Sequence, residues 1–463
     1  MNATGLPLGA AALAGALARG EVSSEDATRG YLARIEARNA EINAVVHLLR
    51  EEAIAAARAA DARRRAGGAI GPLDGIAVAV KDNIDVARAP TTAGIAAYRD
   101  RVASADAFVV QRLRDAGAVI LGKLNMHEAA LGATTATSCF GRCENPHRAG
   151  YTPGGSSGGS GAAVAAGFCA AALGTDTLGS VRVPAAYCGT AGFKPTFGLV
   201  STRGVLPLSW TLDHVGFLAP RVADLRPLLE VCAAFDRESP YARRGPRILV
   251  PKRADPGDLR GLRVGRLANA SEAGLEPDVA RAFERAVAAL ARLGASVVDV
   301  RLDGYDFTRM RREGLLVSEF EAATVLEADL AADPEGFSAE LRAALAFGAK
   351  QPAVRAAQAY RRLAGVRVIA RRAFAGIDVL VAPTTPQPAF AFAAPVPVNQ
   401  ADLTSFANIV GIPAGCVPFG RNADGLPLSV QVMAPAFEDR LVLDVLEALE
   451  RAGDGAGTPA GTP

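Results

Sequence analysis

The chain is poor in the residues on which many active sites are built. Its 463 residues include four histidines, six cysteines, four methionines and one tryptophan. The pair His127-Glu128 lacks the second histidine that a metalloprotease helix carries. His47 and His147 have the pattern of ordinary surface or packed residues. We therefore expect neither a metal site nor a cofactor, and we look for chemistry that does not depend on histidine.

The cysteines and the apolar segments argue against a secreted or membrane-spanning protein. Cys139 and Cys143 have a metal-like spacing, but no second Cys or His pair follows at the distance of a zinc finger. The first twenty residues lack the basic start and apolar block of a secretory signal. The apolar stretch Ala162–Leu173 is too short to cross a bilayer and predicts a close-packed buried helix. We expect reduced cysteines and a cytoplasmic location.

No large charge of one sign is present. The formal net charge is +2, and lysine and arginine are spread along the chain. The basic runs 63–65 and 243–244 are typical of solvated faces, so direct binding to nucleic acid is not expected. Half of the residues are hydrophobic and 21% are charged, which is the composition of a globular protein with ample core.

Alternating helix and strand patterns predict an α/β fold. The stretch Ala10–Ala66 has near-helical apolar spacing and predicts helices. Ile76–Val80 and Ala118–Leu121 are short apolar runs suited to buried strands, with a predicted helix Phe108–Ala116 between them. Periodicity alone predicts only that the chain contains an α/β sheet.

The second half predicts further units of the same kind. Its expected parts are a linker or surface excursion over about 237–261, a βαβ unit over 262–300, helices over about 307–374 that cover the site, and a buried strand over 378–383. We place one domain over 1–452, with an N-terminal helical segment 1–66, a catalytic core 70–220, a C-terminal half 262–452 and a disordered tail 453–463.

Three segments carry the chemistry. Lys81 ends the apolar run Ile76–Val80, and serines lie in the glycine-rich stretches 154–161 and 174–184. By composition, the stretch 154–161 can be a phosphate cradle, a flexible linker or a catalytic loop; it lacks the Gly-Lys-Ser/Thr ending of a phosphate-binding loop. Taken alone, Lys81 is equally compatible with an ion pair to Asp82 or Asp85.

A Ser-His-Asp arrangement is the rival mechanism. Asp213-His214 can supply two of its members, because such triads follow no fixed chain order. No Gly-x-Ser-x-Gly nucleophile motif accompanies the pair, so we favour the lysine and the serines.

The combination resembles the amidase signature family, in its stand-alone amidase branch. The similarity covers about residues 5 to 450, and its motifs occur in the family's order: Lys81-Asp82-Asn83, Gly154–Ser160, Gly174–Pro184, Gly192–Thr196, Leu212–Gly216, Ala407–Pro413 and Gly425–Pro427. The resemblance implies a single large α/β domain whose central, mixed, twisted β-sheet is enclosed by α-helices. It also implies a triad with Ser180 as nucleophile, Ser156 as proton relay and Lys81 as base. The separation of 24 residues between Ser156 and Ser180 fits the family's pattern, and the resemblance therefore selects Ser156 over Ser157. A lysine can act as a base only when neutral, and burial favours its neutral form.

The resemblance also assigns the residues around Ser180. Backbone amides of Thr177, Leu178, Gly179 and Ser180 are expected to form an oxyanion hole. The common family pattern has two glycines before the serine, and Leu178 replaces the first of them. A leucine there would be strained if the position required positive φ, and we expect it to narrow or reshape the acyl pocket.

Asp176 and Arg182 flank the nucleophile. We expect them to form a buried ion pair that supports the loop, in preference to Arg182 binding a substrate carboxylate. The rest of the pocket is expected to come from the loop 126–133 and the helical region after Phe307.

The expected activity is hydrolysis of a small carboxamide to a carboxylate and ammonia or an amine. The expected partner is the small-molecule amide itself; a homodimer stays open, and so does the choice between a urea-derived amide and an arylacetamide. One alternative is the glutaminase subunit of a tRNA-dependent amidotransferase, although Gly204–Trp210 looks more like stand-alone amidases. The other alternative is a non-catalytic binding protein with the same fold.

Overall fold

A mixed β-sheet of eleven strands forms the centre of the part of the chain that the structure describes. The computed structural model describes residues 9–245 and 257–453. The strands are β1 Val45–Leu48, β2 Ala77–Lys81, β3 Val119–Leu124, β4 Ala171–Asp176, β5 Ala191–Lys194, β6 His214–Ala219, β7 Arg263–Leu267, β8 Ser296–Val300, β9 Val379–Pro383, β10 Ala414–Arg421 and β11 Pro427–Met433. Their order is β1-β3-β2-β4-β6-β5-β10-β11-β9-β7-β8. Parallel pairs link β2 to β3 and β4, and β7 to β8 and β9; the remaining pairs are antiparallel.

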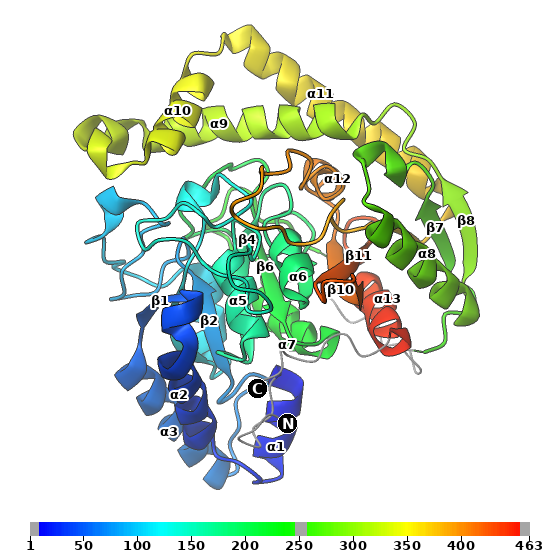
Figure 1. Ribbon diagram of the computed structural model, residues 1–463. Helices are drawn as coiled ribbons and strands as arrows, with labels where there is room; N and C mark the ends of the chain where they lie inside the picture. Colours follow the sequence, from blue (N-terminus) through cyan, green and yellow to red (C-terminus); the bar gives the residue numbers. More distant parts are fainter. Residues whose placement is uncertain (1–8, 246–256, 454–463) are drawn as a thin grey trace.

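Helices surround this sheet (Figure 1). They are α1 Ala10–Ala18, α2 Ser24–Ile42, α3 Arg50–Arg65, α4 Phe108–Asp115, α5 Gly158–Ala165, α6 Arg182–Cys188, α7 Val222–Cys232, α8 Pro277–Arg292, α9 Phe307–Ala332, α10 Ala339–Ala349, α11 Ala353–Ala373, α12 Ser405–Val410 and α13 Asp439–Ala452. The expected fold class, one α/β domain with a mixed sheet enclosed by helices, is confirmed. No helix in the described part of the chain is long and apolar enough to cross a membrane.

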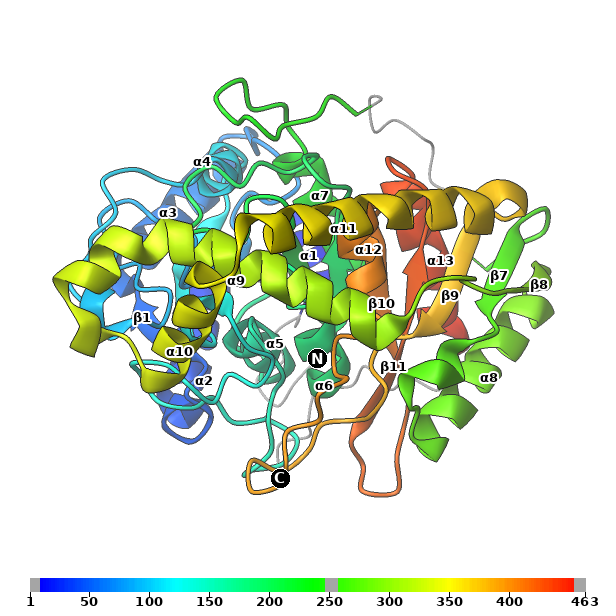
Figure 2. The same ribbon diagram turned by 90° about the horizontal axis from the view of Figure 1, so that it is seen from above.

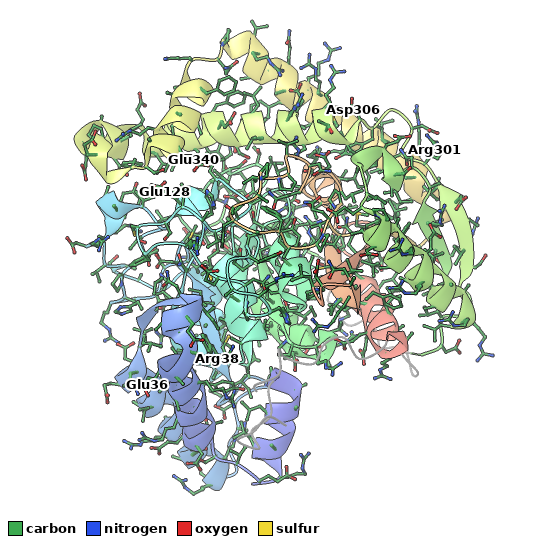
Figure 3. All side chains as sticks on the ribbon, in the orientation of Figure 1. Glu36, Arg38, Glu128, Arg301, Asp306 and Glu340 are labelled. Atoms are coloured by element: carbon green, nitrogen blue, oxygen red, sulfur yellow. The ribbon has the colours of Figure 1, made fainter. Side chains whose placement is uncertain are left out.

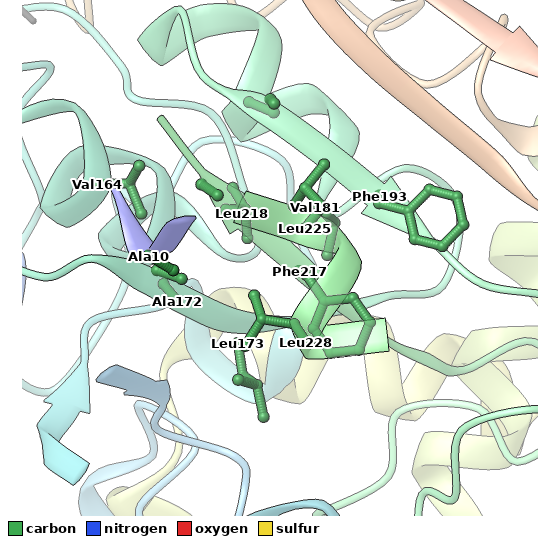
Figure 4. Close-up of a cluster of buried hydrophobic side chains, with 14 of the residues drawn as sticks. Ala10, Val164, Ala172, Leu173, Val181, Phe193, Phe217, Leu218, Leu225 and Leu228 are labelled. Atoms are coloured by element: carbon green, nitrogen blue, oxygen red, sulfur yellow. The ribbon is translucent and has the colours of Figure 1, made fainter. Parts of the chain in front are cut away.

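One apolar core joins the two halves of the chain. Its side chains come from positions as far apart as Ala10 and Leu449. In the close-up of Figure 4, Leu173 of β4 lies near Phe217 of β6, its partner in the strand register. Both residues are fully buried. Strands buried on both faces read as continuous apolar runs, which is why β2, β3 and β9 were visible in the sequence.

The N-terminal segment departs from the all-helical expectation. α2 ends at Ile42, and Asn43 takes a left-handed conformation (φ 54°). The Asn43 side-chain amide then donates to the carbonyl of Phe140 at 2.8 Å. This cap redirects the chain into β1, which pairs antiparallel with β3. The apolar residues of β1 fit a helical spacing equally well, so periodicity alone assigned them wrongly.

The predicted helix over Ala162–Leu173 is also wrong in part. α5 ends at Ala165, the chain reverses at Gly167 (φ 70°), and β4 begins at Ala171. A run of small apolar residues has no period that separates a buried helix from a buried strand. The βαβ unit over 262–300 and the helices after Phe307 are observed as predicted.

Helices α9, α10 and α11 form a cover over one edge of the sheet. α9 and α11 run side by side across the molecule in both views (Figures 1 and 2). The side chains labelled in Figure 3 show Glu128 near Glu340, where α10 meets the loop after β3. Glu128 accepts from the Ser338 backbone N–H at 3.0 Å, and Glu340 accepts from the Thr137 hydroxyl at 3.1 Å. The cover is thereby fixed to a loop that walls the cavity described below.

Part of the expected domain division falls outside the described residues. That holds for most of the tail 453–463 and for positions 246–256 of the expected linker. The division itself stays a prediction.

Candidate active site

Lys81 occupies the last position of β2 and is fully buried. Its Nζ donates to Ser156 Oγ and to Thr175 Oγ1, each at 2.7 Å. The parallel pairing of β2 with β4 places Thr175 beside the lysine, because the carboxyl ends of both strands reach the same edge of the sheet. The lysine and one serine of the glycine-rich stretch are thus in direct contact.

The ion-pair alternative for Lys81 does not hold. Asp82 pairs with Lys123 at 3.2 Å, and Asp85 pairs with Arg101 at 2.7 Å. Lys81 forms no ion pair within residues 9–245 and 257–453. Burial lowers the pKa of Lys81 from 10.5 to about 7, against smaller raising effects of Asp213 and Asp176. A large fraction of this lysine is therefore neutral near neutral pH.

The serines of the glycine-rich stretch have different partners. Ser157 Oγ donates to the Thr175 carbonyl at 3.1 Å, and Ser160 Oγ donates to the Leu173 carbonyl at 3.0 Å. These two hydroxyls attach the start of α5 to β4, whereas the Ser156 hydroxyl meets Lys81. A Cβ at Gly159 would lie 2.3 Å from the Asn125 carbonyl oxygen. Such tight packing does not fit a flexible linker.

Ser180 lies on the loop between β4 and α6 and is partly exposed. It lines a cavity of about 200 Å³. Its carbonyl accepts from the Ser157 N–H at 3.2 Å, so its loop touches the residue next to Ser156. Thr177, Leu178 and Gly179 line the same cavity. The structure therefore gathers the two serine segments beside one cavity.

Asp176 and Arg182 hold the Ser180 loop from beneath. The Asp176 carboxylate accepts from the N–H groups of Gly179 and Val181 at 2.8 and 3.1 Å, and from Arg182 at 3.1 Å. Burial alone would raise the pKa of Asp176, but the charge and hydrogen bonds of Arg182 bring that pKa well below its ordinary value. Arg182 also donates to Asn408 Oδ1 at 2.5 Å, and neither member of the pair lines the cavity.

Replacing Asp176 by Asn is expected to lower the free energy of unfolding by about 3–5 kcal/mol, because Arg182 would keep a buried charge without its counter-ion. Urea unfolding followed by circular dichroism measures this change. Glu272→Gln, which removes one partner of an exposed pair with Arg301, is the matched control and should change little. Equal, small effects of both substitutions would contradict the supporting role of Asp176.

The two residues before Ser180 have separate constraints. Gly179 has φ 138°, and a Cβ there would lie 2.2 Å from Thr404 Oγ1. Leu178 is not among the residues with positive φ, so the strain considered for it does not arise. Its side chain reaches α9, where a Cβ at Gly314 would lie 2.8 Å from Leu178 Cδ2. Leu178 thus closes part of the cavity against the cover.

The histidine mechanism has no geometric support. His214 Nδ1 lies 2.7 Å from the Leu212 carbonyl oxygen, and burial holds the pKa of His214 well below its ordinary value. Asp213 instead accepts from Thr177 Oγ1 at 2.6 Å and from the N–H groups of Leu208 and Ser209 at 2.9 Å each. Asp213 therefore supports the Ser180 loop and does not orient a histidine.

Some cavity residues escaped the sequence analysis. The expected wall from loop 126–133 and from α9 is present as residues 130–133 and as Arg311, Leu315 and Ser318. The segment 397–401 completes the wall and was not expected. Thr175 was also missed as a partner of Lys81. All six cysteines are free thiols, and the described residues contain no cluster of three or more metal-ligating side chains.

A family model described as Amidase matches residues 26–443. The chain belongs to the amidase family. Its curated relatives include the A-type subunit of the glutamyl-tRNA(Gln) amidotransferase of Chloroflexus aurantiacus strain J-10-fl, which is 38% identical with 94% of each chain covered. The corresponding protein of Nitratidesulfovibrio vulgaris strain DP4 is 37% identical with 98% of each chain covered.

Solved structures place the chain among amidase-family enzymes. One, described as a vestigial protein complex that reveals the origins of an s-triazine catabolic enzyme, has 33% identity and a TM-score of 0.90 over 96% of this chain and 98% of the other. The peptide amidase of Stenotrophomonas maltophilia has 31% identity and a TM-score of 0.84 over 98% and 99%. The 6-aminohexanoate cyclic dimer hydrolase has 29% identity and a TM-score of 0.86 over the same shares. Membership of this family implies hydrolysis of a carbon–nitrogen bond.

Proposed function

We propose that this chain is an amidase that hydrolyses a small carboxamide through Ser180, Ser156 and Lys81, without a cofactor. The observation that carries the proposal is the 2.7 Å contact between the buried Lys81 Nζ and Ser156 Oγ. It lies next to the loop that carries Ser180 on a cavity wall. A serine hydroxyl needs a base to become a nucleophile, and this lysine is the base that burial makes available.

The proposed reaction has two halves. Ser180 Oγ attacks the amide carbon while its proton passes to Ser156 Oγ, whose own proton moves to neutral Lys81 Nζ. The carbon–nitrogen bond then breaks, and a proton returns from Lys81 through Ser156 to the leaving nitrogen. Water attacks the acyl-enzyme by the same relay and releases the carboxylate and Ser180. Each proton taken up by Lys81 is thus returned within the same half-reaction.

The backbone amides of Thr177, Leu178 and Ser180 are proposed to hold the oxyanion. The Gly179 N–H, which the family resemblance included, is already donated to the Asp176 carboxylate at 2.8 Å. Asp176 fixes the N–H groups of Gly179 and Val181, and Thr404 Oγ1 donates to the Leu178 carbonyl at 2.6 Å. A loop held at both its N–H and C=O groups keeps its remaining amides in place as charge develops on the oxygen.

The second candidate function is that of a glutaminase within an amidotransferase, because the curated relatives named above belong to such enzymes. In that case the chain would act with other subunits and prefer glutamine. We favour the stand-alone amidase because the run Gly204–Trp210 resembles that branch. We keep a cytoplasmic location as part of the proposal. A non-catalytic binding protein is the third candidate, and the retained Lys81–Ser156 contact argues against it.

The test is ammonia release by the purified chain alone. Glutamine is compared with a panel of simple amides, aryl amides and urea derivatives. Turnover of simple amides without a partner supports the proposal. Turnover of glutamine only, or only after addition of partner subunits, would assign the second function, and no turnover of any amide would contradict both.

Replacing Leu178 by Ala is expected to widen the cavity, because this side chain fills the space against Gly314 of α9. Amides with branched or aromatic acyl groups should gain about tenfold in kcat/KM relative to acetamide. Kinetics on a series of acyl chains measure the ratio. The matched control is Leu326→Ala, farther along α9 and buried away from the cavity lining, which should lower stability without changing the ratio. An unchanged ratio in Leu178→Ala would show that this leucine does not limit acyl size.

A further inference from the structure

We propose that Arg311 binds a carboxylate on the acyl chain of the substrate, so that the substrate is a monoamide of a dicarboxylic acid. This inference rests on the amidase function proposed above and names its substrate class. It replaces Arg182, which the sequence offered as a carboxylate ligand and which lies away from the cavity, with an arginine that lines it.

The contacts of Arg311 leave part of its guanidinium available. The residue lies on α9, and its side chain is 11% exposed. Its Nε donates to Asp402 Oδ1 at 2.5 Å. Its two Nη atoms donate no hydrogen bond to a side chain or carbonyl of residues 9–245 and 257–453. These two atoms are also not completely buried. Arg311 lines the cavity, and the proposal places these Nη groups toward its open space.

Asp402 fixes the direction of this guanidinium. The carboxylate is fully buried and accepts from Thr308 Oγ1 at 2.8 Å as well as from Arg311. One edge of the arginine is thereby held, while the opposite Nη edge keeps the parallel N–H groups that match a carboxylate. Pre-oriented donors lose less side-chain entropy on binding than free ones do.

No acidic side chain of the described residues lines the cavity beside Arg311. Arg311 is the only charged residue among the described residues that line the cavity. Its neighbours on the wall include Leu131, Leu208 and Leu315. A hydrogen bond to a charged group is stronger in such apolar surroundings than in water, so a ligand with a carboxylate at this end is favoured over a neutral one. Ser180 on the same cavity marks where the amide end would react.

The same wall disfavours glutamine. Glutamine carries an α-ammonium beside its carboxylate, and no acidic side chain of the described residues lines the cavity to receive it. Asp402 lies behind Arg311, and both of its oxygens are already engaged. We therefore expect a monoamide without an amino group, such as succinamate or glutaramate, to be the better substrate.

The experiment compares kcat/KM for succinamate and glutaramate with that for the neutral amides butyramide and valeramide, and for glutamine. Wild type, Arg311→Met and the control Arg312→Met are measured; Arg312 is the exposed neighbour on α9 and does not line the cavity. In Arg311→Met, kcat/KM for the carboxylated amides should fall about 10²-fold. For the neutral amides it should change less than about threefold, which also shows that the variant folds. Arg312→Met should leave both unchanged.

Two outcomes would overturn the inference while leaving the amidase function intact. The first is a wild-type kcat/KM for neutral amides that equals the kcat/KM for carboxylated amides. The second is an equal loss on both substrate sets in Arg311→Met with a normal unfolding midpoint, which would make Arg311 a support for α9 only. Absence of turnover on every amide by the wild type would instead remove the proposed function itself.

Discussion

Replacing Ser180 by Ala is expected to lower kcat/KM for amide hydrolysis by about 10⁴-fold or more, to the level left by the oxyanion site and substrate binding alone. The reason is that Ser180 is the only proposed acceptor of the acyl group. The hydroxyl of Ser156 is fully buried and in contact with Lys81, so it cannot take over the attack. Ammonia release with a high enzyme concentration measures the residual rate.

Ser160→Ala is the matched control, since it removes the same atom from the neighbouring glycine-rich stretch. Ser160 Oγ donates to the Leu173 carbonyl, and losing this bond should cost about 1 kcal/mol of stability with little effect on turnover. Combining Ser180→Ala with Lys81→Met should add almost nothing to the loss, because residues that act as one unit are not additive. A Ser180→Ala protein with a tenth or more of wild-type activity would refute the assignment.

The sequence predicted the site best where a reactive side chain and the residues that bury it lie in the same short segment. Lys81 follows a continuous apolar run, so its burial could be predicted, and the low pKa follows from that burial. The α/β class followed in the same way from strands buried on both faces, whereas the single domain with a mixed sheet was predicted from the family resemblance. The choice of Ser156 rested on a family spacing, and the structure adds a physical distinction, since Ser157 and Ser160 bind the β4 backbone.

What escaped prediction depends on segments that meet only after folding. Thr404 holds the Leu178 carbonyl from 226 residues away, and Asn408 reaches Arg182 over the same separation. Arg311 looks like any surface arginine of a helix until Asp402, 91 residues on, is placed beside it. β1 was missed because Asn43, whose cap ends α2, depends on the carbonyl of Phe140. Such contacts have no local periodicity to reveal them.

Replacing Lys81 by Met is expected to abolish turnover and, at acid and neutral pH, to stabilise the fold. The unfolded chain keeps the Lys81 pKa near 10.5, whereas burial lowers it to about 7 in the folded protein. Between these pH values the unfolded state binds the additional proton, so the free energy of unfolding of the wild type rises with pH. Below about pH 7 the full penalty is present. Methionine carries no charge and avoids it.

The difference between Lys81→Met and wild type should therefore be largest below pH 7 and fade by about pH 10.5. It amounts to a few kcal/mol at most, since one pKa unit corresponds to about 1.4 kcal/mol. The lost hydrogen bonds to Ser156 and Thr175 reduce it by an amount that does not depend on pH. Urea unfolding at pH 6 and at the highest pH at which the wild type stays folded measures this slope.

The kcat/KM of the wild type should depend on the protonation state of Lys81. Only neutral Lys81 can accept the proton from Ser156, so kcat/KM should rise with pH through a midpoint near 7. Lys81→Arg, which keeps a charge at every accessible pH, should be both inactive and less stable than the wild type. A Lys81→Met protein that gains no stability at pH 6, or a wild-type profile of kcat/KM that is flat from pH 5 to 9, would contradict the assignment of Lys81 as a base that loses its proton near pH 7. If Lys81→Met instead loses activity and gains stability, the buried lysine destabilises the fold and is needed for catalysis.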